Sequence, residues 1–168
     1  MNLKDLITTV PNFPVEGVMY KDVTSILQNP KAFEYSVESL MKFCTGRRIT
    51  DIVSPDARGF LWGSPVAFLM GVSLHMVRKP NKLPPPVKSQ SYDYEYASGV
   101  LEMKADAPLN ANSNVCIIDD VNATGGTATK TTLLAATVDT TTKNYFVSQV
   151  NTSTGCESPR VRIIAKIT

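Results

Sequence analysis

The sequence is poor in the residues that build metal centres and disulfide frameworks. It contains one histidine and three cysteines among 168 residues, and Cys44, Cys116 and Cys156 are never spaced as a C-x-x-C pair. An odd number of well-separated cysteines argues against a disulfide framework and a zinc site, and favours a reducing cytosol. Because Cys116 lies within an apolar run, we expect it to be a small buried side chain.

Long hydrophobic runs and a strong charge of either sign are also missing. No stretch approaches the roughly 18 apolar residues of a membrane helix, and the N-terminal segment contains Lys4 and Asp5, unlike a signal peptide. The 17 Lys and Arg against 15 Asp and Glu give a net charge of +2, which provides no general field for nucleic acid. We therefore expect a cytoplasmic protein without membrane or nucleic-acid partners, in which any basic site is local.

The length suits one domain, over residues 1–168, because two separate hydrophobic cores would need a longer chain. Apolar residues at helical spacing predict a helix over Ala32–Cys44, and the apolar segment Gly59–Met70 is predicted to be a buried helix that ends at Gly71. Asn29-Pro30 supplies a cap and a first-turn proline for the first of them. Helices alternate with short apolar runs, which predicts an α/β fold with a mainly parallel sheet. The remaining candidates are strands over Ile49–Val53, Ser73–Val77, Leu101–Lys104, Val115–Ile118, Tyr145–Val150 and Arg160–Ile167, and a helix over Thr127–Thr137.

A proline-rich segment from Arg78 to Ala97 interrupts this alternation. It holds four prolines, three lysines and three tyrosines. Prolines at this density are incompatible with a central strand or a long helix, so we expect one long loop. A loop of this length in a compact domain is usually functional or disordered.

The most specific pattern is Val115–Thr127, which reads V-C-I-I-D-D-V-N-A-T-G-G-T. A buried strand delivers Asp119 and Asp120 to its tip, and a Thr- and Gly-rich loop leads into a helix N-terminus. The glycines let backbone N–H groups converge on an anion, and the helix end adds partial positive charge. The pattern predicts a phosphate site beside carboxylates that suit sugar hydroxyls. The alternative is a strand end followed by a capped helix, where Thr and Gly are common; neither a P-loop nor G-x-G-x-x-G is present.

This pattern resembles the phosphoribosyl pyrophosphate (PRPP) loop of the type I phosphoribosyltransferase family. Other segments resemble the adenine phosphoribosyltransferases of that family, in the same order along the chain. The resemblance implies the type I fold, with a mainly parallel central sheet flanked by helices. It also implies a base-side N-terminal region over residues 1–30 and a flexible lid over residues 79–102. The matching segments are Phe13–Asp22, Asp56–Phe60, Arg78–Pro84 and Ser91–Tyr96.

The resemblance implies a reaction in purine salvage: ribose 5-phosphate moves from PRPP to adenine, which gives AMP and pyrophosphate. It implies Mg²⁺ held mainly by PRPP, with no direct protein ligand assigned, and a homodimer. Two alternatives stay open at this point. The acceptor is another purine, such as hypoxanthine or guanine, or the chain is a catalytically inactive binding or regulatory protein with the same fold. Such regulators usually carry a DNA-binding extension, for which this chain has no spare domain.

Individual roles also follow from the resemblance. A carboxyl group at position 95 can relay the proton that the base loses, in a lid that excludes water. Arg58, Lys79, Lys82, Glu95 and Tyr20 could instead be ordinary surface or packing residues. The resemblance implies that the sugar hydroxyls are bound by Asp119 and Asp120, and the 5′-phosphate by Ala123, Thr124, Gly125, Gly126 and Thr127. It implies that the pyrophosphate is bound by Arg58, Arg78, Lys79 and Lys82, and the base by Met19, Tyr20 and Lys21. The implied catalytic residues are Arg58, Glu95 and Tyr96.

Three positions depart from the residue that is usual in the family, and the one histidine is a fourth position of interest. Asn122 replaces the family's usual leucine, and Asn81 and Ala97 replace usual glycines on either side of the lid. Asn tolerates a positive φ, whereas Ala does so poorly, so altered lid geometry is expected after Tyr96. His75, the one histidine, is expected to be structural.

Overall fold

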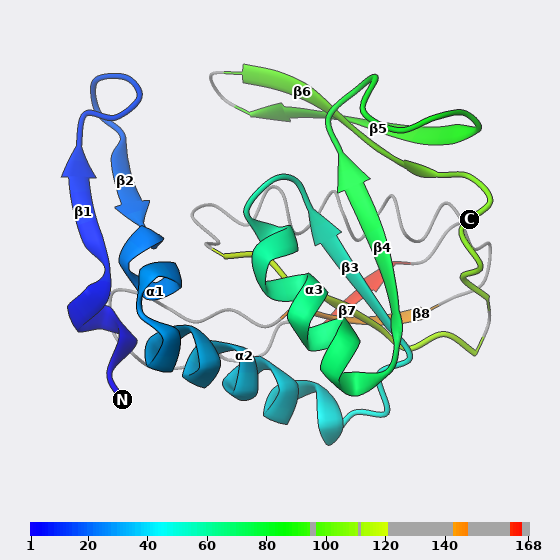
Figure 1. Ribbon diagram of the computed structural model, residues 1–168. Helices are drawn as coiled ribbons and strands as arrows, with labels where there is room; N and C mark the ends of the chain where they lie inside the picture. Colours follow the sequence, from blue (N-terminus) through cyan, green and yellow to red (C-terminus); the bar gives the residue numbers. More distant parts are fainter. Residues whose placement is uncertain (95–96, 111, 121–142, 148–161, 166–168) are drawn as a thin grey trace.

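The computed structural model describes residues 1–94, 97–110, 112–120, 143–147 and 162–165 (Figure 1). The helices are η1 (Leu3–Leu6), α1 (Thr24–Gln28), α2 (Pro30–Thr45) and α3 (Gly59–Met70). The strands are β1 (Thr8–Pro11), β2 (Met19–Asp22), β3 (Asp51–Pro55), β4 (Ser73–Arg78), β5 (Val87–Tyr94), β6 (Ala97–Lys104), β7 (Val115–Ile117), β8 (Lys143–Val147) and β9 (Arg162–Ala165).

Seven of these strands form one mixed sheet in the order β5-β6-β4-β3-β7-β8-β9. The central strands β4, β3, β7 and β8 pair in parallel, and the outer pairs at both edges are antiparallel. Helices α2 and α3 lie against one face of this sheet, and the β1–β2 hairpin stands to one side of it (Figure 1). The predicted α/β class is confirmed, with its parallel strands at the centre.

The two long helices begin and end where local sequence signals place them. The Asn29 side chain accepts a hydrogen bond of 3.2 Å from the N–H of Ala32, and Pro30 occupies the first turn of α2. Helix α3 ends at Gly71, whose φ of 65° is the left-handed conformation that glycine adopts without strain. Both predicted helices are therefore confirmed, and α3 has the predicted bounds.

Apolar side chains pack on both faces of the sheet. Between the sheet and the helices lie Ile52 and Cys116 from the strands, with Trp62 and Val66 from α3. The Trp62 indole N–H donates to Ser36 Oγ at 2.9 Å and so joins α3 to α2. Cys116 is fully buried, as expected, and Cys156 lies outside the described residues. The second face of the sheet carries Val53, Val77, Leu101, Met103, Leu109, Val115 and Ile117.

The expectation of one long loop over Arg78–Ala97 was wrong for its second half. Residues Val87–Tyr94 form β5, which pairs with β6 along its whole length. The prolines did not prevent this strand because all four precede Val87, and β5 lies at the sheet edge, where one side needs no partner. The implied lid region therefore contains a β-hairpin.

Other differences are smaller. The antiparallel β1–β2 hairpin in the N-terminal segment was not among the predicted strands. The strand expected at Ile49–Val53 is β3, shifted by two residues, and the strands expected near the C-terminus overlap β8 and β9. The helix expected over Thr127–Thr137 lies outside the described residues. None of the described helices combines the length and the apolar character that crossing a bilayer requires.

Helix α3 was expected to be buried, but only one side of it is. The outward side exposes Leu61, Phe68 and Leu69, and Phe68 is 84% exposed. Because the helix is apolar on both sides, amphipathicity could not indicate which side faces the sheet.

Replacing Gly63 with alanine should destabilise the fold, because α3 approaches β3 most closely there. A Cβ at Gly63 would lie 1.9 Å from Ser54 Oγ, so backbone would have to shift. Overpacking of this kind costs about 1–3 kcal/mol, which urea unfolding would measure. Gly46→Ala is the matched control, since a Cβ there meets nothing within 4 Å. Equal stability of the two variants would contradict the expected close contact.

Candidate functional site

The candidate site lies where three parallel strands end. Strand β3 is followed by the loop Asp56-Ala57-Arg58, β4 ends at Arg78, and β7 is followed by Asp119 and Asp120. Since β3 pairs in parallel with both β4 and β7, their carboxyl ends meet at one edge. Open α/β sheets bind ligands at this edge. The structure thus brings together side chains that are up to 64 residues apart in sequence.

Arg58 is the central side chain of the site. Its Nε lies 2.7 Å from Asp120 Oδ2, and its Nη1 donates a hydrogen bond to the hydroxyl of Tyr20. Its Cζ also lies 5.0 Å from the centroid of the Tyr20 ring, within the range of a cation–π contact. One guanidinium therefore joins the N-terminal hairpin to the carboxylates after β7.

The two carboxylates differ in their surroundings. The Asp120 side chain is only 4% exposed, and Oδ2, despite the ion pair, lacks a hydrogen-bond donor among the described residues. The backbone N–H of Asp120 donates to Asp119 Oδ1 at 2.9 Å. Burial, followed by the charge and side-chain contact of Asp120, raises the pKa of Asp119 to about 7, although that N–H and Arg58 act in the opposite direction. The pair thus includes a carboxyl that titrates near neutrality.

Gly59 explains how Arg58 comes so close to these carboxylates. A Cβ at this position would lie 3.0 Å from Asp119 Oδ1 and 3.1 Å from the carbonyl oxygen of Ile118. The first turn of α3 therefore packs directly against the chain that leaves β7. A side chain at position 59 would push the two segments apart.

The residues predicted to bind the base lie on β2. Tyr20 is half-buried and packs edge-on against Phe13, with ring centroids 5.0 Å apart. Met19 is 60% exposed, and Lys21 Nζ donates to Thr9 Oγ1 at 2.6 Å. The β1–β2 hairpin therefore presents an aromatic face and backbone next to Arg58.

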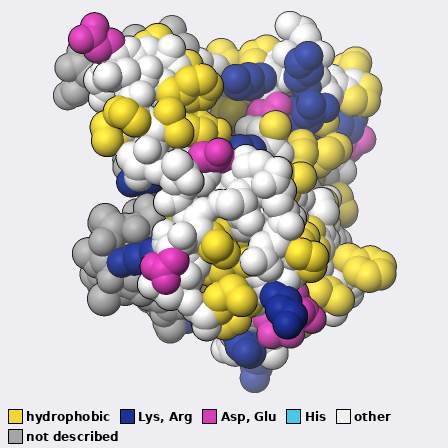
Figure 2. Space-filling model, turned by 60° about the vertical axis from the view of Figure 1, so that its left-hand side comes forward, with side chains coloured by type: hydrophobic (Ala, Val, Ile, Leu, Met, Phe, Trp, Pro, Cys, Tyr) yellow, Lys and Arg dark blue, Asp and Glu magenta, His cyan; other side chains and the backbone are white. Residues whose placement is uncertain are grey.

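The residues predicted to bind pyrophosphate form a second cluster at the end of β4. Arg78 Nε lies 3.5 Å from Asp56 Oδ2, and its Nη1 donates to the carbonyl oxygen of Lys82 at 3.1 Å. The side chains of Lys79 and Lys82 are exposed. Figure 2 shows Lys and Arg side chains gathered in the upper part of the face it presents, beside acidic ones. The positively charged side chains are therefore concentrated locally, which agrees with the small net charge of the whole chain.

Several predicted residues lie outside the described part of the chain. Glu95 and Tyr96 fall between β5 and β6, and Asn122 and the loop over Ala123–Thr127 follow Asp120 in sequence. Of the substituted glycine positions, Asn81 has a φ of 63°, the conformation that glycine would favour.

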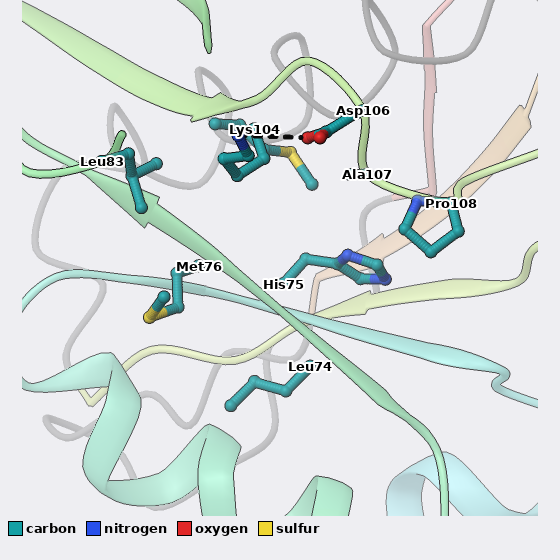
Figure 3. A pocket seen from close by; sticks show the side chains of 9 residues that line it. Leu74, His75, Met76, Leu83, Lys104, Asp106, Ala107 and Pro108 are labelled. Carbon is teal, nitrogen blue, oxygen red and sulfur yellow. Dashed lines mark ion pairs between the residues drawn. The ribbon is translucent and has the colours of Figure 1, made fainter. Parts of the chain in front are cut away.

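His75 is away from this edge. Its Nε2 lies 2.8 Å from Asp51 Oδ1, and both side chains are buried, which agrees with a structural role. Its ring lines a pocket of about 260 Å³ between β4, β6 and the segment after β6 (Figure 3). No residue predicted to bind substrate lines this pocket. Within the described residues, no group of three or more His, Cys, Asp and Glu side chains is arranged to hold a metal ion.

Sequence reasoning missed three contacts of the site. It did not predict that Arg58 touches both Tyr20 and Asp120, or that Asp56 pairs with Arg78. All three contacts join residues that are more than 20 positions apart, and no spacing rule reports such pairs. The only available signal was that each residue lies in a segment resembling the same family.

Comparisons with known proteins give one consistent result, although no family model matches the chain. The chain is 48% identical over 132 residues to an adenine phosphoribosyltransferase of Colwellia psychrerythraea, covering 79% of this chain and 72% of the relative. The crystal structure of adenine phosphoribosyltransferase from Thermoanaerobacter pseudethanolicus matches with a TM-score of 0.77 and 43% identity, covering 81% and 78% of the two chains. The enzyme from Giardia lamblia, complexed with 9-deazaadenine, matches with a TM-score of 0.82 and 32% identity, covering 89% and 84%.

Proposed function

The chain belongs to the adenine phosphoribosyltransferase family, and we propose from this premise how its residues share the reaction. The enzyme transfers ribose 5-phosphate from PRPP to adenine, which yields AMP and pyrophosphate for purine salvage. The position of these residues where the parallel strands end supports a reaction at that edge of the sheet.

The observation that carries the proposal is the position of Arg58 between Tyr20 and Asp120. A base, a sugar and a pyrophosphate must meet at one carbon during the transfer. An aromatic ring and a carboxylate pair that meet at one permanently charged guanidinium match these three substrate parts.

Asp119 and Asp120 hold the ribose hydroxyls in this proposal. The buried Oδ2 of Asp120 forms an ion pair with Arg58 but no well-aligned hydrogen bond among the described residues, so it can still accept one from a sugar hydroxyl. Carboxylates beside the ring also stabilise the positive charge that an oxocarbenium-like transition state develops. The 5′-phosphate is then bound by the backbone and hydroxyl groups of the loop that follows, namely Ala123, Thr124, Gly125, Gly126 and Thr127.

The pyrophosphate is held by basic side chains at the ends of β3 and β4. Arg58 offers several donors in one plane, which suits phosphate oxygens. The further contributors are Arg78, Lys79 and Lys82. Mg²⁺ fits this edge, because it binds through substrate phosphates and one or two carboxylates, and Asp119 and Asp120 supply oxygen donors there. When bound, the ion neutralises charge on the departing pyrophosphate.

The base lies against the N-terminal hairpin. Stacking on Tyr20 holds any flat base, and backbone groups of Met19 and Lys21 select adenine by its edge. Glu95 relays the proton that leaves the base, and Tyr96 belongs to the same covering segment. In this proposal residues 1–30 bind the base and residues 79–102 form the lid, and both segments belong to one domain.

We further propose that the enzyme works as a cytoplasmic homodimer. The exposed apolar side chains of α3, Leu61, Phe68 and Leu69, support self-association. The odd number of well-separated cysteines supports a reducing compartment. Sedimentation of the purified chain, with Phe68→Ser as a variant that should shift the protein to monomer, tests the dimer.

Incubation with PRPP, Mg²⁺ and one nucleobase at a time tests the proposed function. Adenine should be converted to AMP with one pyrophosphate released per turnover, detected by chromatography and a coupled phosphate assay. Turnover of hypoxanthine or guanine but not adenine would overturn the choice of base. PRPP binding by calorimetry without turnover of any base would instead identify a regulatory protein that keeps the fold.

A further inference from the structure

Asp56 is a buried carboxylate in the basic cluster of Arg78, Lys79 and Lys82 at the end of β4. It follows β3 directly and precedes Arg58 by two residues. We propose that Asp56 is a positioning residue, which holds Arg78 and Lys79 in place for pyrophosphate without binding the substrate itself. The inference rests on the proposed function, because it takes Arg78 and Lys79 as pyrophosphate ligands.

The contacts of Asp56 join three parts of the site. Its Oδ2 accepts a hydrogen bond from the backbone N–H of Lys79 at 3.3 Å and lies 3.5 Å from Arg78 Nε. Its own N–H donates to the carbonyl oxygen of Val77 at 2.7 Å. The loop after β3, the end of β4 and the start of the basic segment are therefore linked through one residue.

A purely electrostatic argument makes this carboxylate unexpected. A negative charge beside a pyrophosphate site repels the ligand, so an Asp here must contribute something that offsets the repulsion. Its side chain is only 9% exposed, and Oδ1 is buried without a hydrogen-bond donor among the described residues. A buried carboxylate with an unsatisfied oxygen is costly. This cost is explained if Oδ2, the other oxygen of Asp56, holds Arg78 and the Lys79 backbone in position.

The order that Asp56 provides concerns long, mobile side chains. The Arg78 guanidinium forms an ion pair with Asp56 and donates a hydrogen bond to the carbonyl oxygen of Lys82, and it lies 5.9 Å from the Phe60 ring centroid. Fixing these groups before the substrate arrives removes conformational entropy that binding would otherwise have to overcome. Without Asp56, Arg78 and the Lys79 backbone would be free to move away from the site.

Pyrophosphate affinity, measured by calorimetry in the presence of Mg²⁺, tests the inference directly. Asp56→Ala should weaken pyrophosphate binding and raise KM for PRPP by about tenfold or more, whereas KM for adenine stays within about twofold. Asp56→Asn keeps an acceptor for the Lys79 N–H but not the charge beside Arg78, so it should fall between wild type and Asp56→Ala. The double variant D56A/R78A should lose less affinity than the two single losses combined, because part of the effect of Asp56 acts through Arg78 and the remainder through the Lys79 backbone.

The control is Asp106→Asn, which removes a carboxylate that also pairs with a cation but lies in the pocket of Figure 3. It should leave pyrophosphate affinity unchanged.

If Asp56→Ala does not fold, the Asp56→Asn variant provides the test, and wild-type pyrophosphate affinity in that variant overturns the inference. Equal losses for adenine and pyrophosphate would also overturn it, since they would indicate general damage. A wild-type protein that binds no pyrophosphate would instead refute the proposed function.

Discussion

Replacing Arg58 with alanine should lower kcat/KM for PRPP by about 10²- to 10³-fold, the loss seen when a charge-stabilising group is removed from an active site. The change removes the cation that faces the departing pyrophosphate. It also leaves the buried Asp120 carboxylate without its ion pair at 2.7 Å and the Tyr20 hydroxyl without its donor. Steady-state kinetics with PRPP and adenine varied separately would measure the effect.

The conservative variant Arg58→Lys separates charge from geometry. A lysine keeps the charge but has no planar fork to reach Tyr20 and Asp120 together, so it should recover only part of the activity. Arg48→Ala, at an exposed arginine beyond the end of α2, should retain wild-type kinetics. Full activity in Arg58→Lys would show that charge alone is needed, and full activity in Arg58→Ala would remove Arg58 from the mechanism.

The two long helices and the position of Asp119 and Asp120 after a strand were predictable because short-range signals determine them. Asn29-Pro30 and Gly71 define helix ends through their own backbone chemistry, so α2 and α3 appear where the sequence indicates them. Asp119 and Asp120 follow a short apolar run, which places them at a strand end. In each case the information lies within a few residues of the feature.

The β5 strand and the contacts of the site were not predictable in this way. Strand β5 depends on pairing with β6 at a sheet edge, and the nearby prolines suggested a loop. The link between Arg58 and Tyr20 spans 38 positions, and that between Arg78 and Asp56 spans 22 positions. Only the packing of β2 and of the parallel strands against one another decides which of these side chains meet.

PRPP binding should strengthen as the pH rises through about 7, because Asp119 must be ionised to accept hydrogen bonds from two sugar hydroxyls. Burial and the neighbouring Asp120 raise its pKa to about 7. Below that value kcat/KM for PRPP should fall by about tenfold per pH unit, and above it the value should level off. PRPP has titrating phosphates of its own, so the matched control is Asp119→Asn, which keeps the shape but cannot ionise. Its activity should be low, and this step should be missing from its pH profile.

The same group should affect stability in the opposite direction. Because the folded state holds the Asp119 proton more tightly than the unfolded chain does, this group's contribution to stability is complete below about pH 4 and is lost as the pH rises to about 7. Thermal unfolding should therefore show Asp119→Asn close to wild type in acid and increasingly more stable toward pH 8. A constant difference between the two proteins at all pH values would refute the raised pKa. With the expected result, the ionised carboxyl that the sugar needs is the same group whose burial makes the folded protein less stable at neutral pH.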